Sequence, residues 1–277
     1  AGVTSRFFKR DGKFFVNTDG PDGRLADYEI KYSFGVTPLQ QYLIEMPGFR
    51  FQALGVAWDS RPKENGGQRW FHLYPNEKIT HKDPLHWTGI DQNWNYQCAE
   101  CHSTNLKKRY DASKAVYDTT WSEINVSCEA CHGPGEEHAR SARDPLQRYR
   151  GHFSGERDPL IVHPTRIDQE RAVGVCGQCH GQRMPHPISR AEAWFTSGPT
   201  YRSGERLLEH VDPIAIDTPV LGGADPDLFR FRFWADGTPR LTAYEYQGTT
   251  RSPCYLKGAL TCNSCHTMHS GDVRGMI

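Results

Sequence analysis

The sequence lacks an excess of charge of either sign, since its 277 residues contain 33 Lys and Arg and 33 Asp and Glu. No block of like charges stands out along the chain. Nucleic acids and anionic membrane surfaces attract clustered basic side chains. The composition therefore disfavours both kinds of partner, and we expect no nucleic-acid binding.

Long apolar runs are also missing. The most apolar stretch, residues 43–58, is interrupted by Glu45, Pro47 and Arg50, whereas a membrane-spanning helix needs roughly 20 predominantly apolar residues. We therefore expect no membrane span in this chain. The sequence begins at Ala1 without the charged, apolar and small-residue segments of an export leader, so we expect any export signal to have been removed.

Cysteine and apolar residues are both sparse. Nine Cys in 277 residues are too few for a small fold held together by disulfides. The hydrophobic fraction is 37%, and counting Gly in place of Tyr raises it to about 42%, slightly below the roughly 45–50% of soluble domains. The length permits one large domain or two ordinary ones. We therefore expect something besides side chains to fill part of the interior.

What the sequence does contain is a repeated motif. Eight of the nine cysteines occur in Cys-x-x-Cys-His motifs, the pattern of c-type haem attachment. Composition alone would supply on the order of 0.01 copies. The four motifs are Cys98, Cys101 and His102; Cys128, Cys131 and His132; Cys176, Cys179 and His180; and Cys262, Cys265 and His266.

The spacing suits haem chemistry because two thiols on one helical turn can reach both vinyl groups of a porphyrin and form thioethers. The next residue, His, then supplies the proximal bond to iron. We predict four covalent haem c groups, with His102, His132, His180 and His266 as the proximal iron ligands. The alternative is zinc, but Cys₄ zinc pairs lie roughly 15–20 residues apart and do not require a following His.

Nine further histidines compete for at most four distal positions, and bis-His coordination suits electron transfer. His269 shares a helical face with His266, so we expect it to serve a neighbouring haem. His138 follows the Gly-Pro-Gly break after His132 and should also reach a neighbour. His86 and His210 lie beside apolar residues, where a neutral imidazole can be buried against a haem.

The other histidines are weaker candidates. His163 and His186 lie next to prolines in extended segments and are reserve ligands. His72 alternates with aromatic residues and indicates a core position, while His81 and His152 are expected to face solvent. The ninth cysteine, Cys254, is expected to be a buried free thiol, with an intermolecular disulfide as the alternative.

The sequence predicts an α+β fold with little regular secondary structure. Residues 1–90 form an antiparallel β region without a haem motif, which starts with a hairpin around Asp11-Gly12. Residues 91–277 form a tetrahaem c-type cytochrome domain of short helices and loops. The expected strands are 6–10, 13–17, 26–34, 41–45, 49–58 and 68–74. We further expect a helix at residues 167–175 and a late hairpin of residues 229–234 and 240–246.

The motifs also resemble a known family. Together with Cys131-His132-Gly-Pro-Gly-x-x-His138, they resemble multihaem cytochromes related to the tetrahaem electron acceptor of hydroxylamine oxidoreductase. The stretch from Asn93 to Asn105 resembles exported multihaem cytochromes that are often joined to tetratricopeptide repeats. Members of that group usually carry further haem motifs upstream and downstream. This resemblance leads us to expect that the chain is a fragment or processed product, with further haem-bearing segments or subunits as partners.

These observations favour an electron-transfer protein in the periplasm or outside the cell, acting on redox partner proteins. One alternative is a multihaem reductase or oxidase of small nitrogen or sulfur compounds, in which one iron lacks a distal protein ligand. Another is a subunit of a homo-oligomer or of a polymeric cytochrome filament. The sequence identifies no catalytic residue.

Overall fold

The computed structural model describes residues 2–155, 158–220, 225, 227–241 and 243–269. The chain divides into two compact units. The first comprises residues 1–126 and 195–198, and the second comprises residues 127–194 and 199–277. Across the described residues, every helix is too short or too polar to cross a membrane.

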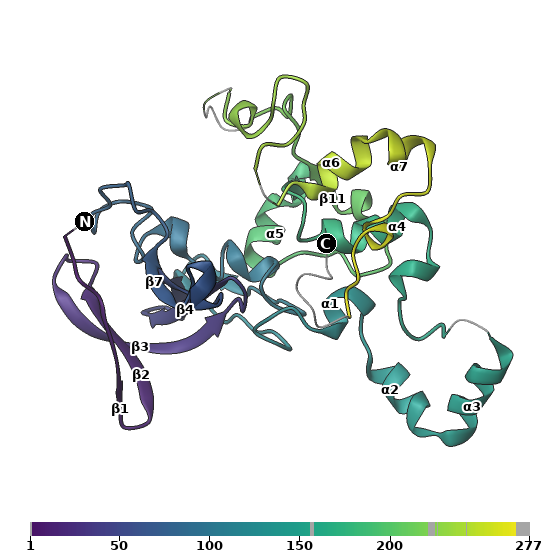
Figure 1. Cartoon of the computed structure of the whole chain (residues 1–277), viewed down its shortest axis with the longest axis horizontal. Coiled ribbons are helices and arrows are strands. Elements are labelled where there is room, and N and C mark those ends of the chain that lie inside the picture. The colour runs from purple at the N-terminus through teal and green to yellow at the C-terminus, as the bar shows by residue number, and fades with distance from the viewer. Residues whose placement is uncertain (1, 156–157, 221–224, 226, 242, 270–277) are drawn as a thin grey trace. The chain divides into compact units, whose positions relative to one another are not determined.

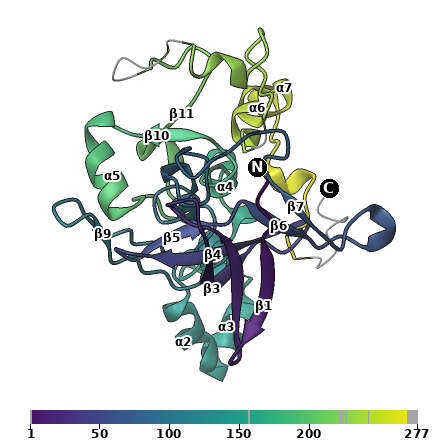
Figure 2. The ribbon, with the colours of Figure 1, turned by 90° about the vertical axis from the view of Figure 1, so that its left-hand side faces the viewer.

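The first unit is built on a seven-stranded antiparallel sheet, whose long strands are purple and blue in Figures 1 and 2. The hydrogen-bonded order is β1-β2-β3-β4-β6-β7, and β5 also pairs with β4. The strands are β1 (Arg6–Arg10), β2 (Lys13–Asp19), β3 (Leu25–Phe34), β4 (Leu39–Met46), β5 (Arg50–Ala53), β6 (Val56–Asp59), β7 (Arg69–His72), and the small pair β8 (Tyr110–Asp111) and β9 (Val116–Tyr117). The predicted N-terminal antiparallel β region is confirmed.

The first hairpin follows its predicted turn. Arg10 of β1 pairs with Lys13 of β2, which leaves Asp11 and Gly12 as a two-residue loop. Both loop residues have positive φ, 51° and 79°. Such a turn matches the right-handed twist of the two strands it joins, and Asp-Gly is a preferred sequence for it.

The apolar run at residues 49–58 forms two strands rather than the single predicted one. Strand β5 pairs with the second half of β4, through Leu43 and Ala53, and β6 pairs with the beginning of β4. The chain turns between them at Leu54, which is buried, and Gly55. A glycine weakens a strand interior and permits a sharp bend, and the apolar pattern does not mark where that bend falls.

The core of the first unit is an aromatic cluster beside the first haem motif. Trp94 is fully buried, and its ring meets those of Phe51 and Trp121 edge to face, at centroid distances of 6.2 and 5.3 Å. Cys98 packs against this cluster. Buried aromatic residues contribute strongly to core stability, about 3–5 kcal/mol for a Trp-to-Ala change. The cluster therefore holds the turn that carries the first motif.

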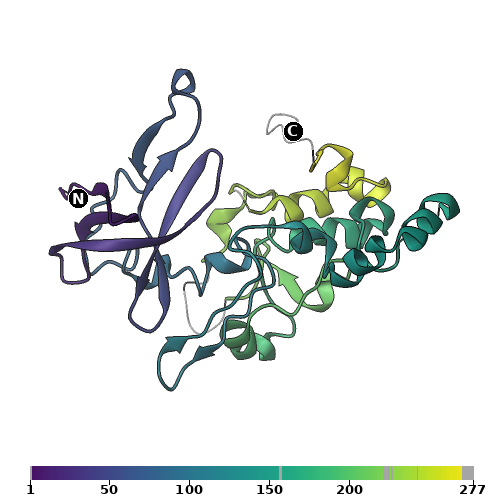
Figure 3. The ribbon, with the colours of Figure 1, turned by 90° about the horizontal axis from the view of Figure 1, so that it is seen from below.

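The second unit consists of short helices, a two-stranded antiparallel sheet and connecting loops (Figure 3). Its elements are α1 (Cys128–His132), α2 (Glu136–Arg143), α3 (Pro145–Ser154), α4 (Gln169–Gly177), β10 (Arg183–Pro185), β11 (Val211–Pro213), α6 (Glu245–Arg251) and α7 (Pro253–Lys257). Helix α5 (Ala191–Ser197) begins in the second unit, and its last residues belong to the first. The predicted α+β class, with short helices and loops after the β region, is confirmed.

Helix α4 corresponds to the helix predicted at residues 167–175. Asp168 caps it, since its carboxylate accepts a hydrogen bond of 3.0 Å from the Arg171 N–H. Val173, which is fully buried, packs with Trp194 and Leu207 in the core of the second unit. Because the helix continues to Gly177, it carries the first cysteine of the third motif.

The predicted late hairpin is wrong. Residues Arg230–Arg232 form a short 3-10 helix, Phe233 makes only an isolated bridge with Pro239, and helix α6 begins at Glu245. Residue 242 of the expected second strand lies outside the described residues. Phe229 and Phe233 are both buried in one cluster, because residues four apart lie on the same side of a helical turn. In the sequence, the alternation of Phe and Arg is the pattern of a strand.

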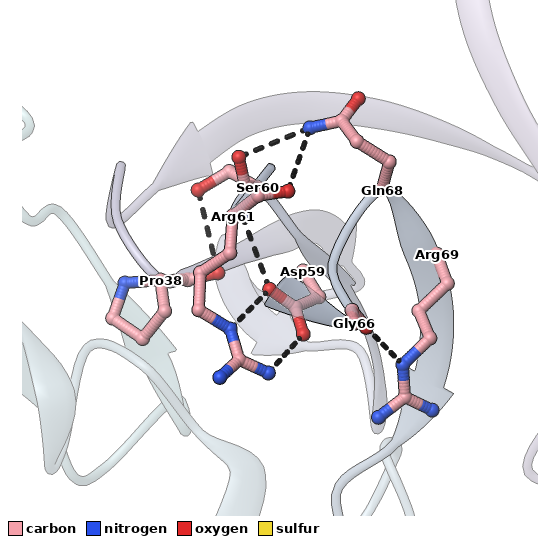
Figure 4. A network of polar contacts seen from close by, with 7 residues as sticks. All are labelled: Pro38, Asp59, Ser60, Arg61, Gly66, Gln68 and Arg69. Atoms are coloured by element: carbon pink, nitrogen blue, oxygen red, sulfur yellow. Dashed lines mark hydrogen bonds and ion pairs between the residues drawn. The ribbon is translucent and has the colours of Figure 1, made fainter. Parts of the chain in front are cut away.

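A polar network closes the β6–β7 hairpin (Figure 4). The Arg61 side chain donates hydrogen bonds of 3.0 and 2.7 Å to the two carboxylate oxygens of Asp59. The Gln68 amide donates to the carbonyls of Ser60 and Arg61, at 3.0 and 3.2 Å. The Arg61 hydrogen bonds lower the pKa of Asp59, which is only 3% exposed, from 3.8 to about 2.

We expect Arg61→Gln to lower the unfolding temperature at neutral pH, because it removes both side-chain bonds to Asp59. The pKa of Asp59 is depressed in the folded state, so its stabilising contribution is present above 3.8 and is lost as the pH falls towards about 2. The difference in unfolding temperature between wild type and variant should therefore stay constant down to about pH 4 and shrink below it. Calorimetry over this pH range measures it.

Arg24→Gln is the matched control. Its guanidinium lies 3.9 Å from Asp22, and the arginine side chain is 88% exposed, so we expect little change at any pH. If the decrease in unfolding temperature caused by Arg61→Gln is the same at neutral pH and at pH 2, its proposed dependence on the ionisation of Asp59 is wrong.

Candidate haem-attachment sites

Each Cys-x-x-Cys-His motif folds as one helical turn. The first and fourth motifs begin with the 3-10 helices η3 (Cys98–Glu100) and η8 (Cys262–Ser264), the second motif is helix α1, and the third starts in the last turn of α4. In three motifs the His N–H donates to the carbonyl of the first Cys, at 3.0 Å in the first, 2.9 Å in the third and 3.0 Å in the fourth. Residues three apart on such a turn share a face, so both thiols of each motif can bond to one ring.

The nine cysteines all lie among the described residues and form no disulfide. No group of three or more His, Cys, Asp or Glu side chains within the described ranges is arranged to hold a metal ion. Cys254 is exposed in the five-residue helix α7, so the expectation that it is buried is wrong. A helix this short presents most of its surface to solvent, and Cys254 lies in its first turn.

The first motif lies in the first unit, against the aromatic core. Burial raises the pKa of the Cys98 thiol to about 11, which keeps this thiol protonated at neutral pH. The His102 ring has exposed surface, but the atoms packed on its other side, including the Phe34 ring at a centroid distance of 5.3 Å, desolvate it. This desolvation lowers the pKa of His102 and favours the neutral imidazole that binds iron.

The other three motifs lie in the second unit. The thiols of Cys176 and Cys262, the first cysteines of the third and fourth motifs, lie close enough to interact with each other. This contact raises the pKa of Cys176 and lowers that of Cys262 to about 7, with burial adding to the rise at Cys176. Cys131 of the second motif is close enough to raise the pKa of Cys176 further. The fold thus brings together motifs that are far apart in the sequence.

The proximal candidate of the second motif is held by a backbone carbonyl. The carbonyl oxygen of Val162 lies 2.6 Å from Nδ1 of His132, so Nδ1 donates the proton. Val162 N–H donates in return to the His132 carbonyl at 3.0 Å. A hydrogen bond of this kind fixes the imidazole tautomer and leaves Nε2 free to coordinate a metal.

Two further histidines surround His132. The His269 ring is nearly parallel to it, at a centroid distance of 5.8 Å and an interplanar angle of 14°. The His163 ring lies edge-on at 6.2 Å, and its Nδ1 is 2.9 Å from the Thr165 hydroxyl. His269 follows the fourth motif in the sequence, but its ring lies beside His132 of the second motif. It is therefore positioned to reach a haem on the second motif rather than one on the fourth.

His138, a distal candidate, is oriented by a carboxylate. Its Nδ1 lies 2.6 Å from Asp158, and both side chains are about two-fifths exposed. A backbone hydrogen bond from Leu160, together with the His138 contact, lowers the pKa of Asp158. The His138 imidazole is therefore held in the tautomer that presents Nε2.

The remaining two distal candidates have both ring nitrogens occupied. His86 is 5% exposed, and its nitrogens lie 2.8 Å from the Thr88 hydroxyl and 3.2 Å from Asp19. His210 contacts the Thr200 hydroxyl through Nδ1 at 2.9 Å and Glu205 through Nε2 at 3.1 Å. Either imidazole would have to give up a contact before it could bind iron.

The reserve candidate His186 has hydrogen bonds that suit iron binding better than those of His86 and His210. Its Nδ1 lies 3.0 and 3.1 Å from the two carboxylate oxygens of Asp212, on the strand that pairs with β10. In the sequence, the position of His186 between two prolines is the only feature that marks it as a possible ligand. Its carboxylate partner, Asp212, lies 26 residues away in the sequence, so no local motif predicts this contact.

One buried polar atom beside the first motif also fits a large prosthetic group. The indole N–H of Trp94 is buried without a hydrogen-bond partner, and Trp94 belongs to the cluster that holds Cys98. Buried donors normally have partners, and a haem carboxylate or ordered water would supply one. The thiols, the imidazoles and this donor therefore suit haem.

One family model matches part of the chain. The family model described as cytochrome c554 and c-prime matches residues 63–133, a span that contains the first two Cys-x-x-Cys-His motifs. No curated protein and no solved structure matches the chain. The match supports a c-type cytochrome that transfers electrons through covalently bound haem iron.

Proposed function

We propose that the protein transfers electrons through four covalently bound c-type haems, most of them with two histidine ligands. The observation that carries this proposal is the fourfold recurrence of Cys-x-x-Cys-His on the same kind of helical turn. Bound haem supplies one-electron chemistry at iron. The protein side chains tether the ring through two thioethers, coordinate the metal and exclude water.

The hydrogen bonds of the imidazoles support the ligand assignment. Nδ1 of His132 donates to the Val162 carbonyl, which leaves Nε2 for iron. We assign His269, whose ring lies parallel beside that of His132, as the distal ligand of the haem on the second motif. Two histidines that stay bound to the iron in both redox states would leave little reorganisation to oppose electron transfer.

His138 and His186 are the next distal ligands that we propose, because a carboxylate holds Nδ1 of each. His86 is a weaker candidate, since both of its nitrogens are engaged inside the first unit. His210 remains a candidate if its contact with Glu205 opens.

The contact between Cys176 and Cys262 supports direct exchange between the third and fourth haems. Since each thiol becomes the tether of one ring, adjacent thiols require adjacent haem edges. We propose that electrons pass between these two haems and the second one within the second unit, and that redox proteins of the periplasm or the cell exterior donate and accept them. Covalent haem attachment takes place outside the inner membrane, which supports this location.

Haem number is tested by intact mass spectrometry of the denatured protein. We expect a mass increase of four haems, because thioethers survive denaturation. Replacing Cys262 and Cys265 together with Ala should leave three haems. Cys254→Ala is the matched control and should retain all four, because Cys254 lies outside every motif. Loss of haem on denaturation would refute covalent attachment.

The ligand assignment is tested at His269. Low-temperature electron paramagnetic resonance of oxidised His269→Ala should show a new high-spin signal equivalent to one haem, because the iron on the second motif loses its distal ligand. His152→Ala, an exposed histidine on α3, should leave the spectrum unchanged. An unaltered low-spin spectrum of His269→Ala would overturn the assignment. A high-spin signal in the wild-type protein would instead favour an enzyme with an open iron.

A further inference from the structure

Lys108 is a completely buried lysine close to the first haem motif. Its side chain is 0% exposed, and its Nζ donates to the Glu100 carboxylate at 2.5 Å and to the Tyr96 carbonyl at 2.9 Å. Glu100 lies inside the motif, between Cys98 and Cys101. The lysine therefore forms an ion pair with the turn that would carry the first haem.

Two aromatic rings complete the surroundings of the ammonium group. The rings of Tyr96 and Phe195 lie stacked at a centroid distance of 5.2 Å and an angle of 29°. Nζ of Lys108 is 5.7 Å from the centroid of the first ring and 5.6 Å from that of the second. Cation–π attraction to two rings adds to the ion pair, and it is strongest where water is excluded.

The backbone around Lys108 is also fixed. Its N–H donates to the Ser197 carbonyl at 3.0 Å, and Gly198 follows with a positive φ of 109° that lets the chain pass close to Lys108. The Lys108 carbonyl accepts a hydrogen bond of 2.9 Å from Thr119. Residues 195–198 thus return to the first unit and cover the lysine.

Burying a charged pair carries a desolvation cost that its mutual attraction only partly offsets, so apolar residues of similar size often serve stability as well or better. A fixed charge beside a redox centre has another effect. Because a positive charge favours the reduced form of a nearby iron and a negative charge favours the oxidised form, a buried pair influences reduction potential with little screening by water.

We propose that Lys108 is a positioning residue for the haem on Cys98 and Cys101, and that the Lys108–Glu100 pair sets the reduction potential of that haem. This inference rests on the proposed function. Lys108 fixes the conformation of the attachment turn through Glu100, and the two opposite charges hold the potential between the values that either charge alone would give.

The test is a redox titration of the full haem-loaded protein at neutral pH, followed by absorbance and electron paramagnetic resonance to resolve the four haems. Lys108→Met removes the positive charge and should lower the potential of one haem. Glu100→Gln keeps the shape, leaves the lysine charge unbalanced and should raise the potential of the same haem. We expect at least a threefold change in the reduction equilibrium in each case, which is about 30 mV for one electron. The double variant should fall between the two.

Lys107→Met is the matched control, because it removes the same charge from the exposed neighbouring residue and should shift the potential much less. If Lys108→Met does not fold, the potential shift of Glu100→Gln alone tests the proposal. Single variants that leave all four potentials unchanged, or shift the same haem in one direction, would overturn the role of Lys108. A wild-type protein without four redox-active haems would instead overturn the proposed function.

Discussion

The attachment sites depend on one backbone feature, the turn that places a histidine N–H against the carbonyl of a cysteine four residues earlier. It closes the first, third and fourth motifs, and helix α1 spans the second. The turn sets two thiols on one side and an imidazole beyond them. Without that geometry the same five residues could tether a ring but not coordinate its metal from below.

The second constraint concerns the imidazoles, each of which has two nitrogens and needs one for iron. A partner on Nδ1 decides which nitrogen is available. The Val162 carbonyl serves His132, Asp158 serves His138, and Asp212 serves His186. Where both nitrogens have partners, as in His86, the imidazole would have to give up one contact to bind iron.

The surroundings of the haem motifs differ between the two units. In the first unit a single motif lies between an aromatic core and a buried ion pair, Lys108–Glu100. In the second unit three motifs converge, and thiols of the third and fourth are in contact. Haems bound at these motifs would have different dielectric surroundings in the two units, which is a physical basis for different reduction potentials.

The sequence by itself determined the kind of chemistry, because a local spacing is enough to bring two thiols and an imidazole to one ring. It also determined the first hairpin, through Asp11-Gly12, and helix α4, which starts after its cap Asp168. Local pattern failed at residues 229–234, where alternating Phe and Arg served a helical turn instead of a strand. It also failed at Cys254, which a short helix leaves exposed.

Only the tertiary structure decided which motifs meet and which histidines have a free nitrogen. The proximity of His269 to His132, of Cys176 to Cys262 and of Lys108 to Phe195 joins segments that are far apart in the sequence. Such pairings follow from the packing of whole elements, and they leave no periodicity or spacing in the chain. For that reason the number of haem motifs could be read from the sequence, whereas their neighbours and electrostatic surroundings could not.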